Sequence, residues 1–302
     1  MSLKRNLKNT LLFSTLLFSL SNCTQEAPKE VSETKEDNLT LAKKPTSWIN
    51  ERVEKAEARL NGTEAGKIVW QAMEAHGGLN KWFQNGPISF RFDYMPVSGG
   101  SAKKSIQQID TWSNKAVHQS IEDKDDTFGW DGTNAWYKRN DTAEFGYDLR
   151  FWALTPYYFE GQPFIFDGQG VKLEKLADKE IEGQAYNIVK VSFDAGTGDA
   201  PDDYYINYYD KNTHLLKAIK YIVSYPKFFK DGNHSPEKLM ILTSYLEEGG
   251  IKLAKTFETY STDENGDKGE LKTKVEVSAV KFMPELENSY FETPSNAKLI
   301  AE

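Results

Sequence analysis

The spacing of apolar residues predicts that the folded part of the chain begins with helices. Apolar side chains recur at helical intervals over residues 48–60, and Asn61-Gly62 follows as a stop signal. Thr63 can cap a second helix, and Gly77-Gly78 marks its end. One further short helical turn follows before the strands begin. We therefore expect a helical lead-in over residues 47–86.

From Ile88 onward apolar and polar residues alternate with a period of two, which is typical of half-buried strands. The pattern predicts about a dozen strands, at residues 88–94, 106–112, 116–121, 127–130, 134–138, 171–176, 185–193, 203–209, 215–224, 238–246, 251–260 and 271–282. The alternation changes phase between Val277 and Val280, which predicts a β-bulge. The expected fold is mainly β with helices (α+β): a large curved antiparallel sheet, or half-open barrel, over residues 87–302.

One apolar segment interrupts the strands. Residues 143–155 place Phe145, Leu149 and Trp152 at intervals of four and three, and a proline follows. We expect a buried helix that lies across the concave face of the sheet and ends at this proline. The aromatic segment 157–166 is expected to form a loop at the rim.

Composition excludes several functional classes. The chain has 302 residues, with 37 Lys and Arg against 45 Asp and Glu, so its formal net charge is −8. An acidic chain without a basic block does not suit nucleic acid as the main partner, because phosphate binding needs clustered cations. The one cysteine excludes an intrachain disulfide and a cysteine-based zinc site.

The N-terminus has the pattern of a secretion signal. Residues 1–22 begin with basic side chains and continue into the apolar run 11–20, which is too short for the roughly 20 residues that a spanning helix needs. Leu20-Ser21-Asn22-Cys23 resembles the bacterial lipobox, which implies that Cys23 is lipid-modified. The alternative is an ordinary signal peptide with a coincidental cysteine.

A polar segment follows the signal. Residues 23–46 are rich in charge and poor in bulky apolar side chains, so we expect a disordered tether that leads to a single domain over residues 47–302. A lipid on Cys23 would attach this domain to a membrane of the cell envelope. Thr24 follows the cysteine where enteric inner-membrane lipoproteins carry Asp, so the outer membrane, on its periplasmic face or the cell surface, is the expected location.

A search for catalytic and metal-binding motifs finds little. G-x-S-x-G, H-E-x-x-H and the P-loop pattern are all absent from the sequence. Residues 263–267 have the acidic density of a calcium loop, but Lys268 stands where that loop needs glycine. We therefore expect no cofactor, no metal and no enzymatic activity. A hydrolase with paired carboxylates stays open as an alternative, because 45 acidic residues allow many pairs.

Several short stretches, together with the order of the elements, carry a family resemblance. The stretches are Ala75–Leu79, Phe128–Trp136, Tyr208–Leu216, Val280–Pro284 and Phe291–Pro294. Over roughly residues 65–295 the chain resembles the lipoprotein-carrier superfamily of LolA, LolB and RseB, and in particular uncharacterised envelope lipoproteins of Bacteroidetes. The resemblance implies a half-closed barrel whose apolar cavity holds acyl chains. A lipid anchor fits a receptor or stationary binder better than a shuttle.

Two functions follow as hypotheses. In the first, an acyl chain or another amphiphile binds, without chemistry, among Phe145, Leu149, Trp152, Tyr158, Phe164, Trp130, Trp136 and Tyr208. In the second, the same scaffold is an interaction or sensor module, and segment 157–166 docks an envelope protein partner. Aromatic residues on strands commonly fill a core, so the helix at 143–155 decides whether space for a ligand remains.

Overall fold

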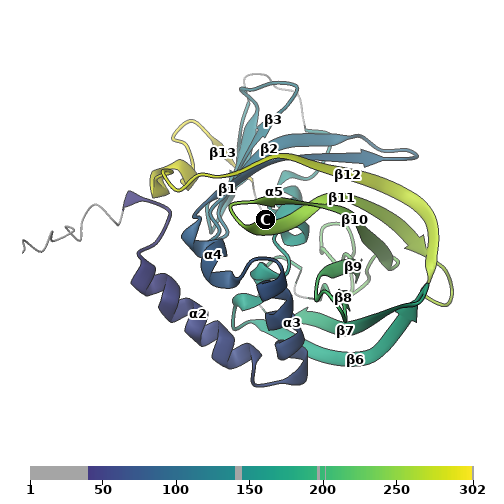
Figure 1. Ribbon diagram of the computed structural model, residues 1–302. Coiled ribbons are helices and arrows are strands. Elements are labelled where there is room, and N and C mark those ends of the chain that lie inside the picture. The colour runs from purple at the N-terminus through teal and green to yellow at the C-terminus, as the bar shows by residue number, and fades with distance from the viewer. Residues whose placement is uncertain (1–39, 140–144, 196–197, 201, 301–302) are drawn as a thin grey trace, which may run out of the picture. The chain divides into compact units, whose positions relative to one another are not determined.

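A computed structural model of the protein describes residues 40–139, 145–195, 198–200 and 202–300 (Figure 1). The expected signal peptide, Cys23 and all but the last residues of the expected tether lie outside the described residues. The fold, its cavity and the contacts reported below all belong to the described part of the chain.

A 13-stranded antiparallel sheet forms most of the structure. Its strands are β1 (Ile88–Pro96), β2 (Lys103–Ile109), β3 (Ala116–Ser120), β4 (Thr127–Trp130), β5 (Ala135–Lys138), β6 (Val171–Ile181), β7 (Gln184–Phe193), β8 (Tyr205–Asp210), β9 (Leu216–Tyr221), β10 (Lys238–Glu248), β11 (Ile251–Thr262), β12 (Lys268–Phe282) and β13 (Lys298–Leu299). Each expected strand corresponds to one of these, and only the two-residue β13 was not expected.

The order of the strands shows how the sheet is built. Strands β1 to β5 form one meander and β6 to β12 form another, and the pairing of β1 with β12 joins the two. Strands β6 and β13 are the two edges, so the sheet is not closed. Figure 1 shows that it curves strongly around α5. The expected curved antiparallel sheet is confirmed.

One local prediction on the strands, the bulge in the last long strand, is confirmed as well. The register of β1 against β12 shifts opposite Ala279, whose φ of 51° interrupts the alternation where a bulge was expected. Asp131 and Gly132 form the turn between β4 and β5, and Gly132 has a φ of 99°. The Asp131 Oδ1 atom accepts hydrogen bonds from the amides of Thr133 and Asn134 (2.8 and 2.7 Å), which fixes this hairpin.

Three helices cover one end of the strands: α2 (Thr46–Leu60), α3 (Glu64–Ala75) and α4 (Leu79–Gln84) (Figure 1). Thr63 caps α3, as predicted, by accepting a hydrogen bond from the Gly66 amide (3.0 Å). The end of α3 lies against the turn between β10 and β11, where a Cβ atom on Gly77 would come within 2.2 Å of the Gly250 carbonyl oxygen. Glycine at position 77 therefore permits both a φ of 119° and this close approach.

Helix α5 (Leu149–Glu160) corrects the expected helix at residues 143–155. It begins later because the Asp148 side chain accepts a hydrogen bond from the Phe151 amide (2.8 Å) and caps the first turn. It also continues past Pro156, so the prediction that this proline ends the helix was wrong. Burial of the following turn outweighs the lost proline hydrogen bond.

The expected aromatic rim loop at residues 157–166 is a further correction. Its first part belongs to α5, and its last part forms the short 3₁₀ helix η1 (Phe164–Asp167). Tyr157, Phe159, Phe164 and Phe166 are all buried. The segment therefore fills the interior and does not offer an exposed aromatic surface.

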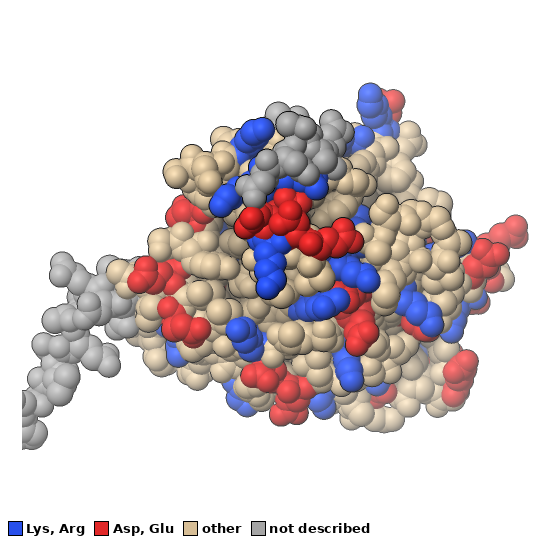
Figure 2. Space-filling view, turned by 90° about the horizontal axis from the view of Figure 1, so that it is seen from above, with Lys and Arg blue, Asp and Glu red and all other residues tan. Residues whose placement is uncertain are grey.

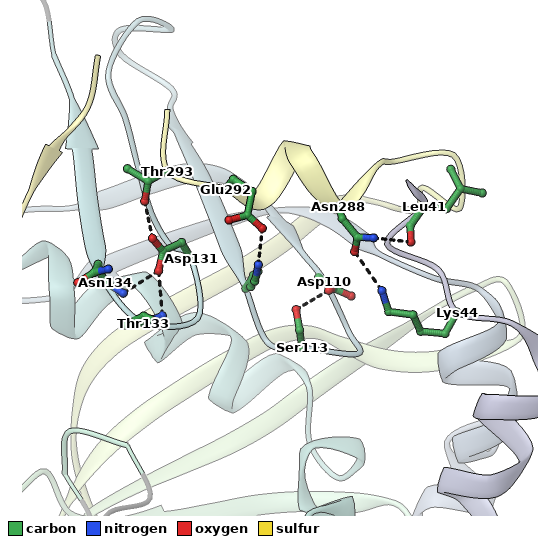
Figure 3. Close-up of polar contacts among 11 residues, drawn as sticks. Leu41, Lys44, Asp110, Ser113, Asp131, Thr133, Asn134, Asn288, Glu292 and Thr293 are labelled. Atoms are coloured by element: carbon green, nitrogen blue, oxygen red, sulfur yellow. Dashed lines mark hydrogen bonds and ion pairs between the residues drawn. The ribbon is translucent and has the colours of Figure 1, made fainter. Parts of the chain in front are cut away.

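The C-terminal segment crosses the turns at the helical end of the sheet and holds the N-terminal entry to the domain (Figure 3). Asn288, in the 3₁₀ helix η2 (Asn288–Phe291), donates to the Leu41 carbonyl and accepts from Lys44 Nζ (both 3.0 Å). Thr293 donates to Asp131 Oδ2 (2.6 Å) in the β4–β5 turn. Residues 41–44, the last part of the expected tether, thus contact the domain.

Basic and acidic side chains lie close to one another on the face shown in Figure 2. Figure 2 shows Lys and Arg side chains interspersed with Asp and Glu side chains over the face viewed from above. Neither sign forms a continuous patch among the side chains drawn there, so this face has no feature of a phosphate-binding surface.

Candidate functional site

A cavity of about 250 Å³ lies between α5 and the concave face of the sheet. The sheet contributes side chains from both meanders, among them Tyr94 of β1, Tyr221 of β9 and Met240 of β10. Helix α5 contributes the opposite wall, including Trp152 and Tyr158. Most of this lining is apolar or aromatic, so the cavity suits an apolar ligand.

Two buried hydrogen bonds hold α5 to the two halves of the sheet. His118 of β3 donates from Nε2 to the Ala153 carbonyl (2.8 Å) and accepts at Nδ1 from the Ser105 hydroxyl (3.1 Å). On the other side, Asn207 of β8 donates to Gln162 Oε1 just after the helix (2.9 Å). Helix α5 is thus attached to both halves of the sheet.

The aromatic rings of α5 and the sheet meet edge to face. Trp152 packs against Phe92 and Tyr94 at centroid distances of 6.3 and 5.2 Å. Phe159 packs against Tyr221 at 4.9 Å. This edge-to-face geometry is favourable for aromatic quadrupoles and stabilises the contact between α5 and the sheet.

Charged groups also line the cavity. Arg150 forms a bidentate pair with Asp199 (2.6 and 2.9 Å) and lies 5.3 Å from the centre of the Trp130 ring. Lys103, the first residue of β2, and Lys238, the first residue of β10, also line the cavity. Burial lowers the pKa of both lysines.

Three of the predicted cavity residues line this cavity: Trp130, Trp152 and Tyr158. Leu149 is buried in the first turn of α5, outside the lining. Phe145 precedes the helix and packs against Phe128 and Tyr137 at centroid distances of 5.9 and 6.0 Å, also away from the lining.

The other three predicted residues lie elsewhere. Phe164 stacks on Trp82 of α4 (4.7 Å between centroids, 9° between planes), in the core under the helices. Trp136 packs with Ala42, Val117 and Phe291 on the face of the sheet opposite to α5. Tyr208 also points to that opposite face, because its neighbours Asn207 and Tyr209 point to the α5 side.

Sequence reasoning missed the polar members of the lining. Tyr205 and Tyr221 could have been placed on the concave face by their strand parity once the sheet order was known. The sequence did not indicate that Lys103 and Lys238 line a cavity, since a lysine at a strand end is ordinarily solvent-exposed.

The buried histidines serve structure. His76 donates from Nδ1 to the Lys252 carbonyl (2.7 Å) and accepts at Nε2 from the Leu216 amide (3.2 Å), which joins the end of α3 to the sheet. Burial lowers the pKa of His76 and of His118 to about 4, so both rings are neutral at pH 7. Both nitrogens of each ring are engaged in hydrogen bonds, so neither of these two rings is available as a free base.

A shallow hollow along α2 contains two further arginines that are already engaged. Arg52 pairs with Asp167 through two hydrogen bonds (2.6 and 3.1 Å) and lies over the rings of Phe83 and Trp112. Arg59 donates to the Phe166 carbonyl (2.7 Å). These contacts fasten α2 to η1, so the hollow is explained by packing.

The described residues have neither a cluster of metal ligands nor a helix suited to span a membrane. Within these ranges no three His, Cys, Asp or Glu side chains gather closely enough to hold a metal ion. In the same part of the chain, none of the helices has the length and hydropathy required to cross a bilayer.

No protein-family model matches the chain, and no curated protein sequence matches it. Solved structures do match. A LolA superfamily protein from Nitrosomonas europaea aligns with a TM-score of 0.50 at 9% identity, over 76% of this chain and 98% of that one. A lipoprotein-sorting protein domain from Vibrio parahaemolyticus aligns with a TM-score of 0.48 at 13% identity, over 74% of this chain and 94% of that one. The chain has the LolA-like fold.

Proposed function

We propose that the protein binds an amphiphile with one acyl chain in the cavity between α5 and the sheet, without converting it chemically. The observation that carries this proposal is the cavity itself, which apolar and aromatic side chains line on both walls. The fold agrees with this proposal. The chain shares the architecture of the LolA superfamily protein of Nitrosomonas europaea, and the family resemblance in the sequence implies an apolar cavity for acyl chains. The absence of a free catalytic base at His76 and His118 favours binding over catalysis.

The volume limits the size of the ligand. At about 250 Å³ the cavity is slightly smaller than the roughly 300–1,000 Å³ of sites for drug-sized ligands. If a methylene group occupies about the volume of a water molecule, roughly 30 Å³, the cavity holds about eight of them. One chain segment fits this space, whereas several acyl chains at once would not.

The chain alone gives only weak binding. Eight buried methylenes at about 0.8 kcal/mol each contribute roughly 6 kcal/mol. Association costs at least about 4 kcal/mol, whereas micromolar binding requires a net of about −8 kcal/mol. Polar contacts at the head of the ligand must therefore supply a large part of the affinity.

The cellular setting belongs to the same proposal. A lipid on Cys23 would hold the domain at the outer membrane, where amphiphiles are supplied by the bilayer itself. The alternative of a docking module loses its expected surface, because segment 157–166 is largely buried. Binding of an amphiphile is thus the function that the described residues support best, and the lipid anchor expected at Cys23 adds the envelope location to the proposal.

A cavity-filling variant tests the proposal. Leu154 lies half-buried on α5 and lines the cavity, so Leu154→Trp should occupy the ligand space. We expect uptake of a fluorescent fatty acid to fall at least tenfold while far-ultraviolet circular dichroism stays unchanged. The matched control is Ile181→Trp at the exposed end of β6, which should bind like the parent. Equal uptake by both variants would refute binding in this cavity.

A further inference from the structure

Lys103 and Lys238 lie at the same end of the sheet. Strand β10 runs from Lys238 toward the turn that contacts α3, so Lys238 lies at the end remote from the helices. Strand β1 starts beside α4 and runs away from it, and β2 begins at Lys103 after the turn. Both lysines therefore lie at the rim that α2, α3 and α4 do not cover, and both line the cavity.

Aromatic rings hold each ammonium group. Lys103 Nζ lies 4.4 Å from the ring centre of Trp152 and 4.6 Å from that of Tyr94, its cross-strand partner. Lys238 Nζ lies 5.9 Å from the ring centre of Tyr221, which is its cross-strand partner in turn. A ring face stabilises a cation without using its N–H donors, so the donors stay available for an anion.

The two lysine charges have no counterion. Among the described residues neither ammonium group takes part in an ion pair with Asp or Glu. The acids of the lining are already engaged: Asp199 pairs with Arg150, and Asp203 accepts hydrogen bonds from the amide and the hydroxyl of Ser224.

Burial and mutual repulsion make this arrangement unfavourable without an anion. Burial lowers the pKa of Lys103, and the charge of Lys238 lowers it further, so the two ammonium groups are close enough to interact. Burial lowers the pKa of Lys238 as well. An anion between the two lysines would offset both costs.

Two buried hydroxyls lie on the same face of the sheet, toward the same rim. Thr259 of β11 and Thr273 of β12 are cross-strand partners and are almost fully buried. The Thr273 hydroxyl lies within reach of the Tyr94 hydroxyl, and the Thr259 hydroxyl lies within reach of the Tyr221 hydroxyl, although neither contact has the geometry of a full hydrogen bond. Buried hydroxyls are ordinarily well paired, so polar atoms of a ligand would improve this environment.

We propose that the amphiphile bound in the cavity carries an anionic head group, a carboxylate or a phosphate, which Lys103 and Lys238 bind at the rim. This inference rests on the proposed function, because it assigns the head group of the same ligand. Contacts between the head group and the lysines would also supply the affinity that burial of about eight methylenes does not provide. Hydrogen bonds that involve charged groups are about twice as strong as neutral ones.

Matched ligands test the head group. The full chain carrying Cys23→Ala, which prevents lipidation, is titrated with palmitate, palmitoyl lysophosphatidate and hexadecanol, and each displaces a neutral fluorescent probe. We expect at least one of the two anions to bind tenfold or more tightly than hexadecanol. Inorganic phosphate alone is included to separate a lipid head group from a free anion. Phosphate binding as tight as that of the anionic lipids would overturn the inference.

Matched variants assign the contact. Lys103→Met and Lys238→Met should each weaken binding of the preferred anion at least fivefold and leave hexadecanol within twofold. Lys190→Met is the control, because Lys190 Nζ lies over the Tyr204 ring at 4.9 Å but outside the cavity lining, so it removes an equivalent charge. Equal loss in all three variants would indicate long-range electrostatics and would contradict the assignment.

The two proposals can fail separately. If palmitate, palmitoyl lysophosphatidate and hexadecanol bind equally well and Leu154→Trp blocks all three, the cavity binds acyl chains and the head-group inference is wrong. If none of the three ligands binds, the proposed function is wrong and the head-group inference falls with it.

Discussion

Acidification should destabilise the protein by protonating His118, which links α5 to the sheet. The buried ring donates to the Ala153 carbonyl, accepts from Ser105 and stacks on Phe128 at a centroid distance of 4.3 Å. Protonation adds a hydrogen at Nδ1, where the ring accepts a bond, and places a charge in an apolar environment. Both effects oppose protonation in the folded state, which agrees with the lowered pKa.

The sign and size of the effect follow from linkage. The folded pKa of His118 is about 4, against about 6.5 in the unfolded chain, so the unfolded state binds more protons between these values. Stability from this residue is therefore complete above pH 6.5 and is lost as the pH falls toward 4. Between pH 7 and pH 4.5 the loss amounts to about 2.4 kcal/mol.

A variant isolates this contribution from other titrating groups. Glu160 is buried without a hydrogen-bond partner and its pKa is raised by burial, so it changes stability with pH in the opposite direction. We compare the parent with His118→Gln, which keeps a hydrogen-bonding side chain but does not titrate. Urea unfolding followed by tryptophan fluorescence gives both free energies of unfolding at pH 7 and at pH 4.5.

The free energy of unfolding of the parent, minus that of His118→Gln, should fall by about 2.4 kcal/mol between the two pH values. His76→Gln should show a shift of similar size, because His76 has the same lowered pKa from burial. Parallel pH curves for the parent and both variants, within about 0.5 kcal/mol, would refute the reasoning.

Two further predictions concern the elements that frame the cavity. Asp148→Ala should destabilise the protein by about 1 kcal/mol through loss of the α5 cap, whereas Asp148→Asn, which removes the charge but keeps the cap, should cost clearly less in urea unfolding. Gly77→Ala should lower stability by about 2–3 kcal/mol, since its Cβ would meet the Gly250 carbonyl oxygen at 2.2 Å. Gly183→Ala has a positive φ but open space, so its thermal shift should be smaller, and equal shifts would contradict the clash.

The fold could be predicted largely because its signals are local. Alternation with a period of two marked each long strand, and the phase change before Val280 marked the bulge at Ala279. The start of α5 was placed too early, at residue 143, because the capping role of Asp148 was overlooked. The continuation past Pro156 could not be predicted, because it depends on tertiary burial that no local rule contains.

The cavity could be predicted only in part because it is assembled from distant strands. Helical spacing indicated that Trp152 is buried on α5, whereas Tyr158 was expected in a rim loop and in fact belongs to the same helix. Lys103 and Lys238 come together through the order β2-β1-β12-β11-β10 and the curvature of the sheet. Neither the pairing of β1 with β12 nor the curvature can be read from either lysine's neighbours in the sequence.

Native mass spectrometry tests the central claim most directly. The full chain carrying Cys23→Ala is purified without added lipid, its mass is measured under native conditions, and bound material is extracted and identified. The account predicts one bound amphiphile per protein, with a single acyl chain and an anionic head, that is lost in Leu154→Trp. A ligand-free mass that stays unchanged after incubation with palmitate would contradict it.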